Sequence, residues 1–176
     1  MFTEFKNDKL ENHPTIQWFA DILNKRYSGI RLRGGAVVDI LEGREPKDYD
    51  FTNSGSGDIE AFVQNGFVFK YKTKSSETYE FEAEGKTTTV QFLSRNESDF
   101  DFTISKSCYD FKKKITLVDT IAFKNKVLIP ITFEHVSNAL NSLRRIVHWR
   151  KKGYKIHDKT YLSLLNVVGQ SEEFES

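Results

Sequence analysis

Residues 33–51 read RGGAVVDILEGREPKDYDF, which predicts a strand end, a glycine turn, a short helix and a second strand with two aspartates. Successive side chains of a strand point to opposite faces, so Asp48 and Asp50, on either side of Tyr49, are expected to share one face. Adjacent carboxylates repel each other unless a cation lies between them, and Mg²⁺ prefers such oxygen ligands. The strand therefore predicts a metal site at Asp48 and Asp50.

The glycine turn predicts a phosphate contact. Gly34 and Gly35 have no Cβ, so the backbone can approach a ligand closely. The short helix that follows directs its first N–H groups toward the turn, where they favour an anion. A phosphate cradle beside metal-binding carboxylates is the arrangement that phosphoryl or nucleotidyl transfer requires.

The same stretch resembles a known family motif. In the head domain of class II CCA-adding enzymes and bacterial poly(A) polymerases, within the DNA polymerase beta nucleotidyltransferase superfamily, the first motif runs Gly-Gly-x-Val-Arg-Asp, a short helix, Gly-Arg and Lys-Asp-x-Asp. Val38 stands where that family has arginine. The matching residues are Gly34, Gly35, Val37, Asp39, Gly43, Arg44, Lys47, Asp48 and Asp50.

Two later stretches extend this resemblance over about residues 30–154. Residues 99–110 resemble the second motif of the family, Arg-Arg-Asp-Phe-Thr-Ile-Asn-Ala followed by Tyr-Asp, with Asp101 at the aspartate. Both arginines are replaced, by Asp99 and Phe100. Residues 137–154 resemble the helix that enters the neck of these enzymes, and Arg144 lies on one of its arginines.

The resemblance implies an α+β, nucleotidyltransferase-like fold. We expect a mixed or antiparallel sheet of about five strands flanked by helices, with a short C-terminal helical extension. The expected domains are a head over residues 1–131 and a neck-like extension over 132–170, within the same compact unit. The nucleobase-selecting neck motif of the family, Glu-Asp-x-x-Arg, is not found.

The resemblance also implies a chemistry. It predicts a Mg²⁺-dependent nucleotidyltransferase that moves a nucleotide from an NTP to an acceptor hydroxyl and releases pyrophosphate. An RNA or tRNA 3′ end is the first choice of acceptor, and a protein hydroxyl is the second. Asp48 and Asp50 are the predicted catalytic and metal-binding residues. The predicted nucleotide-binding residues are Gly34, Gly35, Arg44, Asp101 and Arg144.

A second hypothesis is a catalytically inactive nucleotide-binding or interaction protein, such as an antitoxin-like protein or an inhibitor, on the same fold. The superfamily adds a third carboxylate from a neighbouring strand, but residues 87–93 offer Thr89, Gln91 and Leu93 at the matching positions. Each lost charged contact to a triphosphate removes about 1.5–3 kcal/mol. The acids that could replace the third carboxylate are Glu80, Glu82 and Asp101.

The composition and charge of the chain limit which binding partners and which cellular location are expected. Lys and Arg number 26 against 25 Asp and Glu, so net charge does not indicate nucleic-acid binding. A basic run between Arg144 and Lys159, with Trp149 and Tyr154 among its cations, predicts an RNA or triphosphate contact. The single Cys108 excludes an intrachain disulfide and favours a reducing, cytoplasmic location. No apolar run of about 18 residues occurs, so no membrane span is expected.

Hydrophobic spacing predicts the remaining elements. Residues 1–12 and 171–176 read as a loose lead-in and a frayed tail. Apolar residues at helical spacing predict helices over 14–26, 36–41, 58–65, 132–152 and 158–168. Alternation predicts strands over 30–33, from about 47, and over 67–71, 79–82, 87–93 and 99–110.

Overall fold

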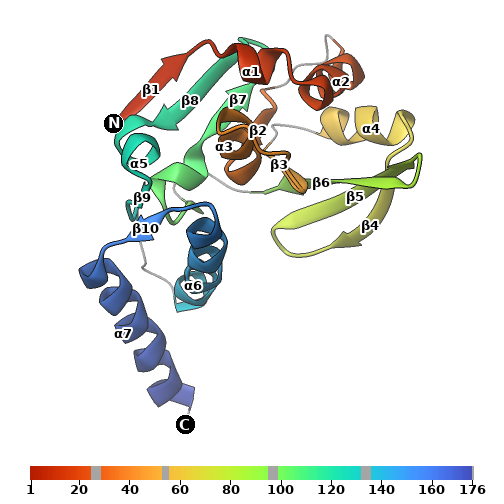
Figure 1. Cartoon of the computed structure of the whole chain (residues 1–176). Helices are drawn as coiled ribbons and strands as arrows, with labels where there is room; N and C mark the ends of the chain where they lie inside the picture. The colour runs from red at the N-terminus through yellow and green to blue at the C-terminus, as the bar shows by residue number, and fades with distance from the viewer. Residues whose placement is uncertain (25–28, 53–55, 95–98, 132–135, 176) are drawn as a thin grey trace. The chain divides into compact units, whose positions relative to one another are not determined.

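The computed structural model describes residues 1–24, 29–52, 56–94, 99–131 and 136–175 (Figure 1). No helix in this part of the chain is long and apolar enough to cross a membrane.

The chain forms two compact units. We call residues 3–96 and 107–117 the sheet unit, and residues 1–2, 97–106 and 118–176 the helical unit. The expected division into a head over 1–131 and an extension over 132–170 stays a prediction.

Eight of the described strands form one mixed sheet, in the order β1-β8-β7-β2-β3-β6-β5-β4. β2 pairs antiparallel with β3 and β7, whereas β3 pairs parallel with β6. β5 is antiparallel to both β6 and β4. The strands are β1 (Phe2–Phe5), β2 (Arg31–Arg33), β3 (Asp48–Thr52), β4 (Val68–Lys72), β5 (Ser76–Ala83), β6 (Lys86–Leu93), β7 (Cys108–Asp110) and β8 (Ile115–Asp119).

The α+β class is confirmed, but the expectation of about five strands was wrong. Residues 1–12, expected to be a loose lead-in, form β1 and the short helix α1 (Asp8–Glu11). The side chains of β1 are mostly exposed, so no hydrophobic alternation marks it in the sequence. Its extended state depends on backbone pairing with the distant β8, which local reasoning cannot detect.

The predicted strand over residues 99–110 was also wrong for most of its length. Residues 103–106 form a 3₁₀ helix, η2 (Thr103–Lys106), and only β7 is extended. One oxygen of the Asp101 carboxylate accepts the N–H of Phe102 at 2.9 Å, an aspartate–backbone bond that competes with a strand ladder.

The core of the sheet unit is a cluster of aromatic rings on one face of the sheet. The unit's longer helices, α2 (Pro14–Leu23) and α4 (Ser56–Gln64), contribute Phe19 and Phe62 to it. The ring of Phe19 meets those of Tyr49 at 5.0 Å and Phe51 at 5.3 Å. Tyr49 and Phe51 of β3 therefore face this helical layer. The helix after the glycine turn, α3 (Gly35–Leu41), contacts α1, β2 and β3.

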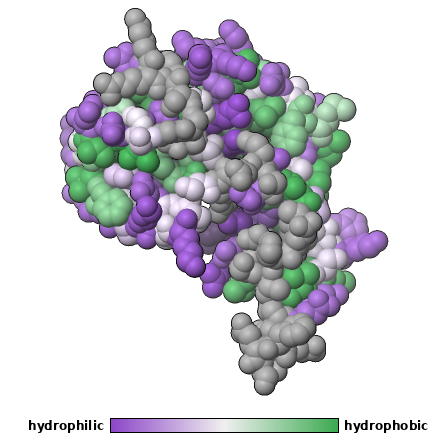
Figure 2. Space-filling model, turned by 180° about the vertical axis from the view of Figure 1, so that it is seen from behind, coloured by the Kyte–Doolittle hydropathy of each residue, from purple (hydrophilic) through white to green (hydrophobic). Residues whose placement is uncertain are grey.

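The edge strand β4 contributes little to that core, because all five of its residues are exposed. Hydrophobic patches interrupt the hydrophilic surface in Figure 2. Large exposed apolar side chains on α4 and β4 are Val63, Val68, Phe69 and Tyr71.

The helical unit contains α5 (Thr120–Asn125), α6 (Val136–Lys151) and α7 (Asp158–Glu175), with a short parallel pair of β9 (Val127–Leu128) and β10 (Lys155–Ile156). The predicted helix over 132–152 corresponds to α6, and residues 132–135 lie outside the described part. The helix predicted over 158–168 continues to Glu175 as α7, so the expected frayed tail was wrong for residues 171–175.

The carboxylate of Asp119 caps α5 and makes the stability of this unit depend on pH. Its carboxylate accepts the N–H groups of Ile121 and Ala122 at the start of α5, and it lies 3.0 Å from the Met1 ammonium. Burial alone raises the pKa of the Asp119 carboxyl, but the side chain of Thr103, the Met1 ammonium and the N–H of Ala122 outweigh burial and lower the pKa below its ordinary value. The carboxylate therefore stabilises the fold above the unfolded pKa of about 3.9, and this contribution is lost as pH falls through the lower folded pKa.

We expect Asp119→Asn to lower the free energy of unfolding at pH 7 by up to about 1 kcal/mol, because asparagine still caps α5 but loses the negative charge beside the Met1 ammonium and the helix N-terminus. The difference from the wild-type protein should shrink below about pH 4, because the unfolded wild-type chain then takes up a proton on Asp119 before the folded chain does. Urea unfolding at pH 7, 5 and 3 measures both effects. A difference that stays constant down to pH 3 would argue against the charged cap.

Candidate functional site

β3 presents its two carboxylates on one face. Tyr49 and Phe51 are buried against α2, whereas Asp48 is exposed and Asp50 is half-buried. Since side chains alternate along a strand, Asp48 and Asp50 lie together on the face away from that aromatic layer. This local geometry agrees with the sequence.

The neighbouring strands complete a polar row on that face. Arg33 of β2 is directly opposite Asp50, and Gln91 of β6 is the partner of Asp50 on its other side. Thr89 is the corresponding partner of Asp48. Residues paired across strands share a face, with Cβ atoms about 4.5–5.5 Å apart. Asp50 is therefore flanked by a cation and an amide.

Arg33 is only 4% exposed, and its Nε donates to Thr52 Oγ1 at 2.8 Å. The Nε2 of Gln91 donates to Thr78 Oγ1 at 3.1 Å. Both long side chains are thereby held on the sheet. The sequence offered Gln91, with Thr89 and Leu93, where the superfamily has a third carboxylate, but Arg33 was not singled out, although an arginine inside a short strand before the glycine turn was the available signal.

The residues around Asp50 do not fit the divalent metal that the fold implies. In the part of the chain that the structure describes, no group of three or more His, Cys, Asp or Glu side chains could hold a metal ion. Glu80 lies on β5 beyond Thr89 and pairs with Lys70 at 3.5 Å. A divalent ion at Asp50 would meet two carboxylates, a neutral amide and a guanidinium, whereas Mg²⁺ favours an oxygen cage with excess negative charge.

Gly34 shapes the turn through its backbone, and its predicted phosphate contact stays a prediction. Its φ of 59° lies in the region that favours glycine, which explains why glycine is needed here. Its N–H donates to the carbonyl of Ser107 at 2.7 Å. This donor of the predicted phosphate cradle is thus used by the fold, and Gly35 begins α3 directly after it.

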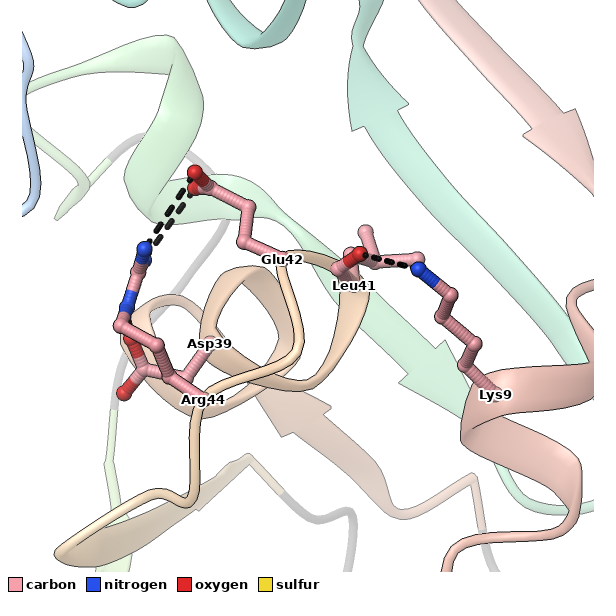
Figure 3. Close-up of polar contacts among 5 residues, drawn as sticks. All are labelled: Lys9, Asp39, Leu41, Glu42 and Arg44. Atoms are coloured by element: carbon pink, nitrogen blue, oxygen red, sulfur yellow. Dashed lines mark hydrogen bonds and ion pairs between the residues drawn. The ribbon is translucent and has the colours of Figure 1, made fainter.

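Arg44 forms a local ion-pair cluster (Figure 3). Its Nε donates to Asp39 at 3.1 Å, and its terminal nitrogens donate to Glu42 at 3.2 and 3.4 Å. Burial opposes the charge of Arg44, but these two carboxylates outweigh burial and raise the pKa of the guanidinium. Arg44 is therefore held by two carboxylates of its own unit, and its predicted phosphate contact stays a prediction.

The remaining two predicted residues lie in the helical unit. Asp101 is 4% exposed, and one of its oxygens accepts both Ser142 Oγ at 2.8 Å and Arg145 at 2.6 Å. It ties the segment before η2 to α6. Arg144 is exposed on α6, and its neighbour Arg145 makes the ion pair.

The prediction that Trp149 and Tyr154 lie at an RNA-binding surface was wrong. Trp149 and Tyr154 are 6% and 1% exposed and meet edge to face at 5.0 Å. Their rings pack in the core of the helical unit because the turn after α6 folds back on it, so they offer no face for base stacking. The contact of the cations between Arg144 and Lys159 with RNA or a triphosphate stays a prediction. One of these cations, Arg150, lies over the ring of Tyr161.

Comparison with solved structures identifies the fold. A CCA-adding enzyme in complex with CTP matches with a TM-score of 0.70 and 17% identity, over 99% of this chain and 48% of that chain. The Thermotoga maritima CCA-adding enzyme complexed with tRNA gives a TM-score of 0.70 and 17% identity, over 98% and 47%. A tRNA-processing enzyme gives 0.61 and 20%, over 90% and 50%. The fold is therefore that of a CCA-adding enzyme head, as the sequence predicted, and the chain spans about half the length of these proteins.

The family is more specific than the fold. The family described as Gabija anti-defense 2 family protein, Gad2, matches residues 4–145. The chain belongs to this family. No curated protein matches it.

Proposed function

We propose that this protein counters the Gabija defence by binding a component of it, with a nucleotidyltransferase-like fold as the scaffold. The observation that carries the proposal is the Gad2 family match, which covers residues 4–145 and thus most of the chain. It supports an inhibitor or interaction protein, one of the two hypotheses that the sequence left open.

The candidate site supports binding over catalysis. Nucleotidyl transfer relies on cations that neutralise the triphosphate and on carboxylates that hold metal ions. Here β6 places the neutral Thr89 and Gln91 beside the two aspartates, and a buried guanidinium lies opposite Asp50. Arg44 is held by Asp39 and Glu42, and the N–H of Gly34 by Ser107.

The second candidate function is nucleotidyl transfer from an NTP to an acceptor hydroxyl. The shared face of Asp48 and Asp50 beside the glycine turn favours it. Similar structures contain CTP, ATP or tRNA, which makes an RNA 3′ end the first acceptor to test and a protein hydroxyl the second. The basic stretch from Arg144 to Lys159 would then contact the RNA.

Asparagine substitution of the carboxylates separates the two functions. We expect Asp48→Asn and Asp50→Asn to retain Gabija inhibition at the wild-type level, because binding does not require these charges. The wild-type protein should not transfer label from any of the four NTPs to RNA, tRNA or Gabija proteins. The measurements are survival of Gabija-defended cells under challenge and NTP labelling with purified protein.

Lys70→Gln is a matched surface control, since it removes an exposed charge from the same sheet. If both asparagine variants remain folded but lose inhibition, and wild-type protein labels an acceptor, nucleotidyl transfer replaces binding as the function.

A further inference from the structure

We infer that Arg33 is the built-in counter-cation of the Asp48–Asp50 face and takes the place of a divalent metal ion there. The inference extends the proposed function, because a protein that acts by binding has no need of a catalytic metal. It rests on the geometry of the sheet unit alone, so it is tested apart from Gabija inhibition.

Arg33 lies beside Asp50 in the sheet. Arg33 and Asp50 are paired in the antiparallel β2–β3 ladder. Paired residues project from the same face with Cβ atoms about 4.5–5.5 Å apart. The Arg33 side chain therefore leaves the sheet directly beside that of Asp50. The register therefore gives Asp50 a permanent cationic neighbour.

A hydrogen bond holds the Arg33 side chain over β3. The Nε of Arg33 donates to Thr52 Oγ1 at 2.8 Å, and Thr52 lies two residues after Asp50 on the same strand and face. The guanidinium is thus held over β3, the strand that carries both carboxylates. Arg33 is 4% exposed, so it does not swing into solvent to admit another cation.

The positive charge of Arg33 offsets part of the negative charge of the two aspartates. Arginine stays protonated at all ordinary pH values, and a buried charge is stable only when opposite charge compensates it. With the neutral Thr89 and Gln91 beside them on β6, the two aspartates and Arg33 sum to one negative charge, whereas three carboxylates would sum to three. A divalent ion at Asp50 would gain little attraction and would be repelled by the guanidinium.

The test is a Mn²⁺ titration of the full chain, with free Mn²⁺ measured by electron paramagnetic resonance at fixed ionic strength. We expect the wild-type protein and Asp50→Asn to bind Mn²⁺ equally weakly. Arg33→Met, which keeps the length of the side chain and removes its charge, should gain a site at least about tenfold tighter. The double variant Arg33→Met/Asp50→Asn should lose that gain.

Arg31→Met is the matched control. Arg31 lies on the same strand and face but is opposite Thr52 and pairs with Asp110 at 3.6 Å. We expect it to bind Mn²⁺ as the wild-type protein does. An equal gain in Arg31→Met would show a general charge effect and overturn the role of Arg33. A folded Arg33→Met that gains no affinity would overturn it as well.

If Arg33→Met does not fold, the comparison of the wild-type protein with Asp50→Asn still decides. A wild-type Mn²⁺ site that Asp50→Asn abolishes would contradict the inference, and equal weak binding by both supports it. Failure of Gabija inhibition in cells would count against the proposed function and leave this result unchanged.

Discussion

Replacing Phe51 by alanine is expected to lower the free energy of unfolding by about 3–5 kcal/mol. Phe51 is fully buried at the centre of the sheet unit. Its ring lies 5.3 to 6.0 Å from four others, those of Phe19, Phe62, Phe92 and Phe111. Alanine removes this burial and leaves a cavity, because strands and helices on all sides hold the surrounding rings in place.

Phe69→Ala is the matched control, since it makes the same chemical change at a side chain that is 52% exposed. We expect this variant to lose less than about 1 kcal/mol of unfolding free energy, because the Phe69 ring is largely exposed and meets that of Tyr79 at 5.6 Å. Urea unfolding followed by circular dichroism compares the two. Equal midpoint shifts would mean that the aromatic cluster is not the core of the unit.

The second large effect is expected at Asp101. Asp101→Asn should lower the stability of the helical unit by about 2–4 kcal/mol. The carboxylate accepts hydrogen bonds from Phe102, Ser142 and Arg145 at 2.6 to 2.9 Å, and an amide of the same shape cannot accept them all. The loss stays below that of a fully buried ion pair because Arg145 is 30% exposed and remains partly hydrated.

Hydrogen exchange of the α6 amides measures this loss locally, since Asp101 ties α6 to the segment before η2. Arg145→Gln and the double variant complete a double-mutant cycle, and we expect the two single effects to be non-additive. Asp158→Asn, which removes an exposed carboxylate from the same unit, is the control. Additive effects at Asp101 and Arg145 would mean that the ion pair contributes nothing.

Local patterns in the sequence predicted much of the sheet unit. Helical spacing of Ile16, Phe19 and Leu23 predicted α2, and the alternation around Tyr49 predicted the shared face of Asp48 and Asp50. The glycine turn and α3 also lie where the sequence placed them. These features depend on residues within one or two turns of each other, so the chain specifies them without knowledge of the fold.

Contacts between distant segments changed the interpretation of the site. Gln91 and Arg33 lie 41 and 17 residues from Asp50 in the chain. Only the register of the sheet places them beside Asp50. Trp149 and Tyr154 were expected at an RNA surface but are buried, because the turn after α6 packs them on each other. The sequence of residues 1–12 contains no pattern that marks β1, since its partner β8 begins at Ile115.

The sequence by itself determined the elements around the glycine turn, the face of β3 that carries the carboxylates and the likeness of the fold to a CCA-adding enzyme head. Only the tertiary structure decided which side chains stand beside those carboxylates. The physical reason is that alternation along a strand is a local property, whereas the register between strands is chosen by the packing of the whole sheet. That register places a guanidinium and an amide beside Asp50.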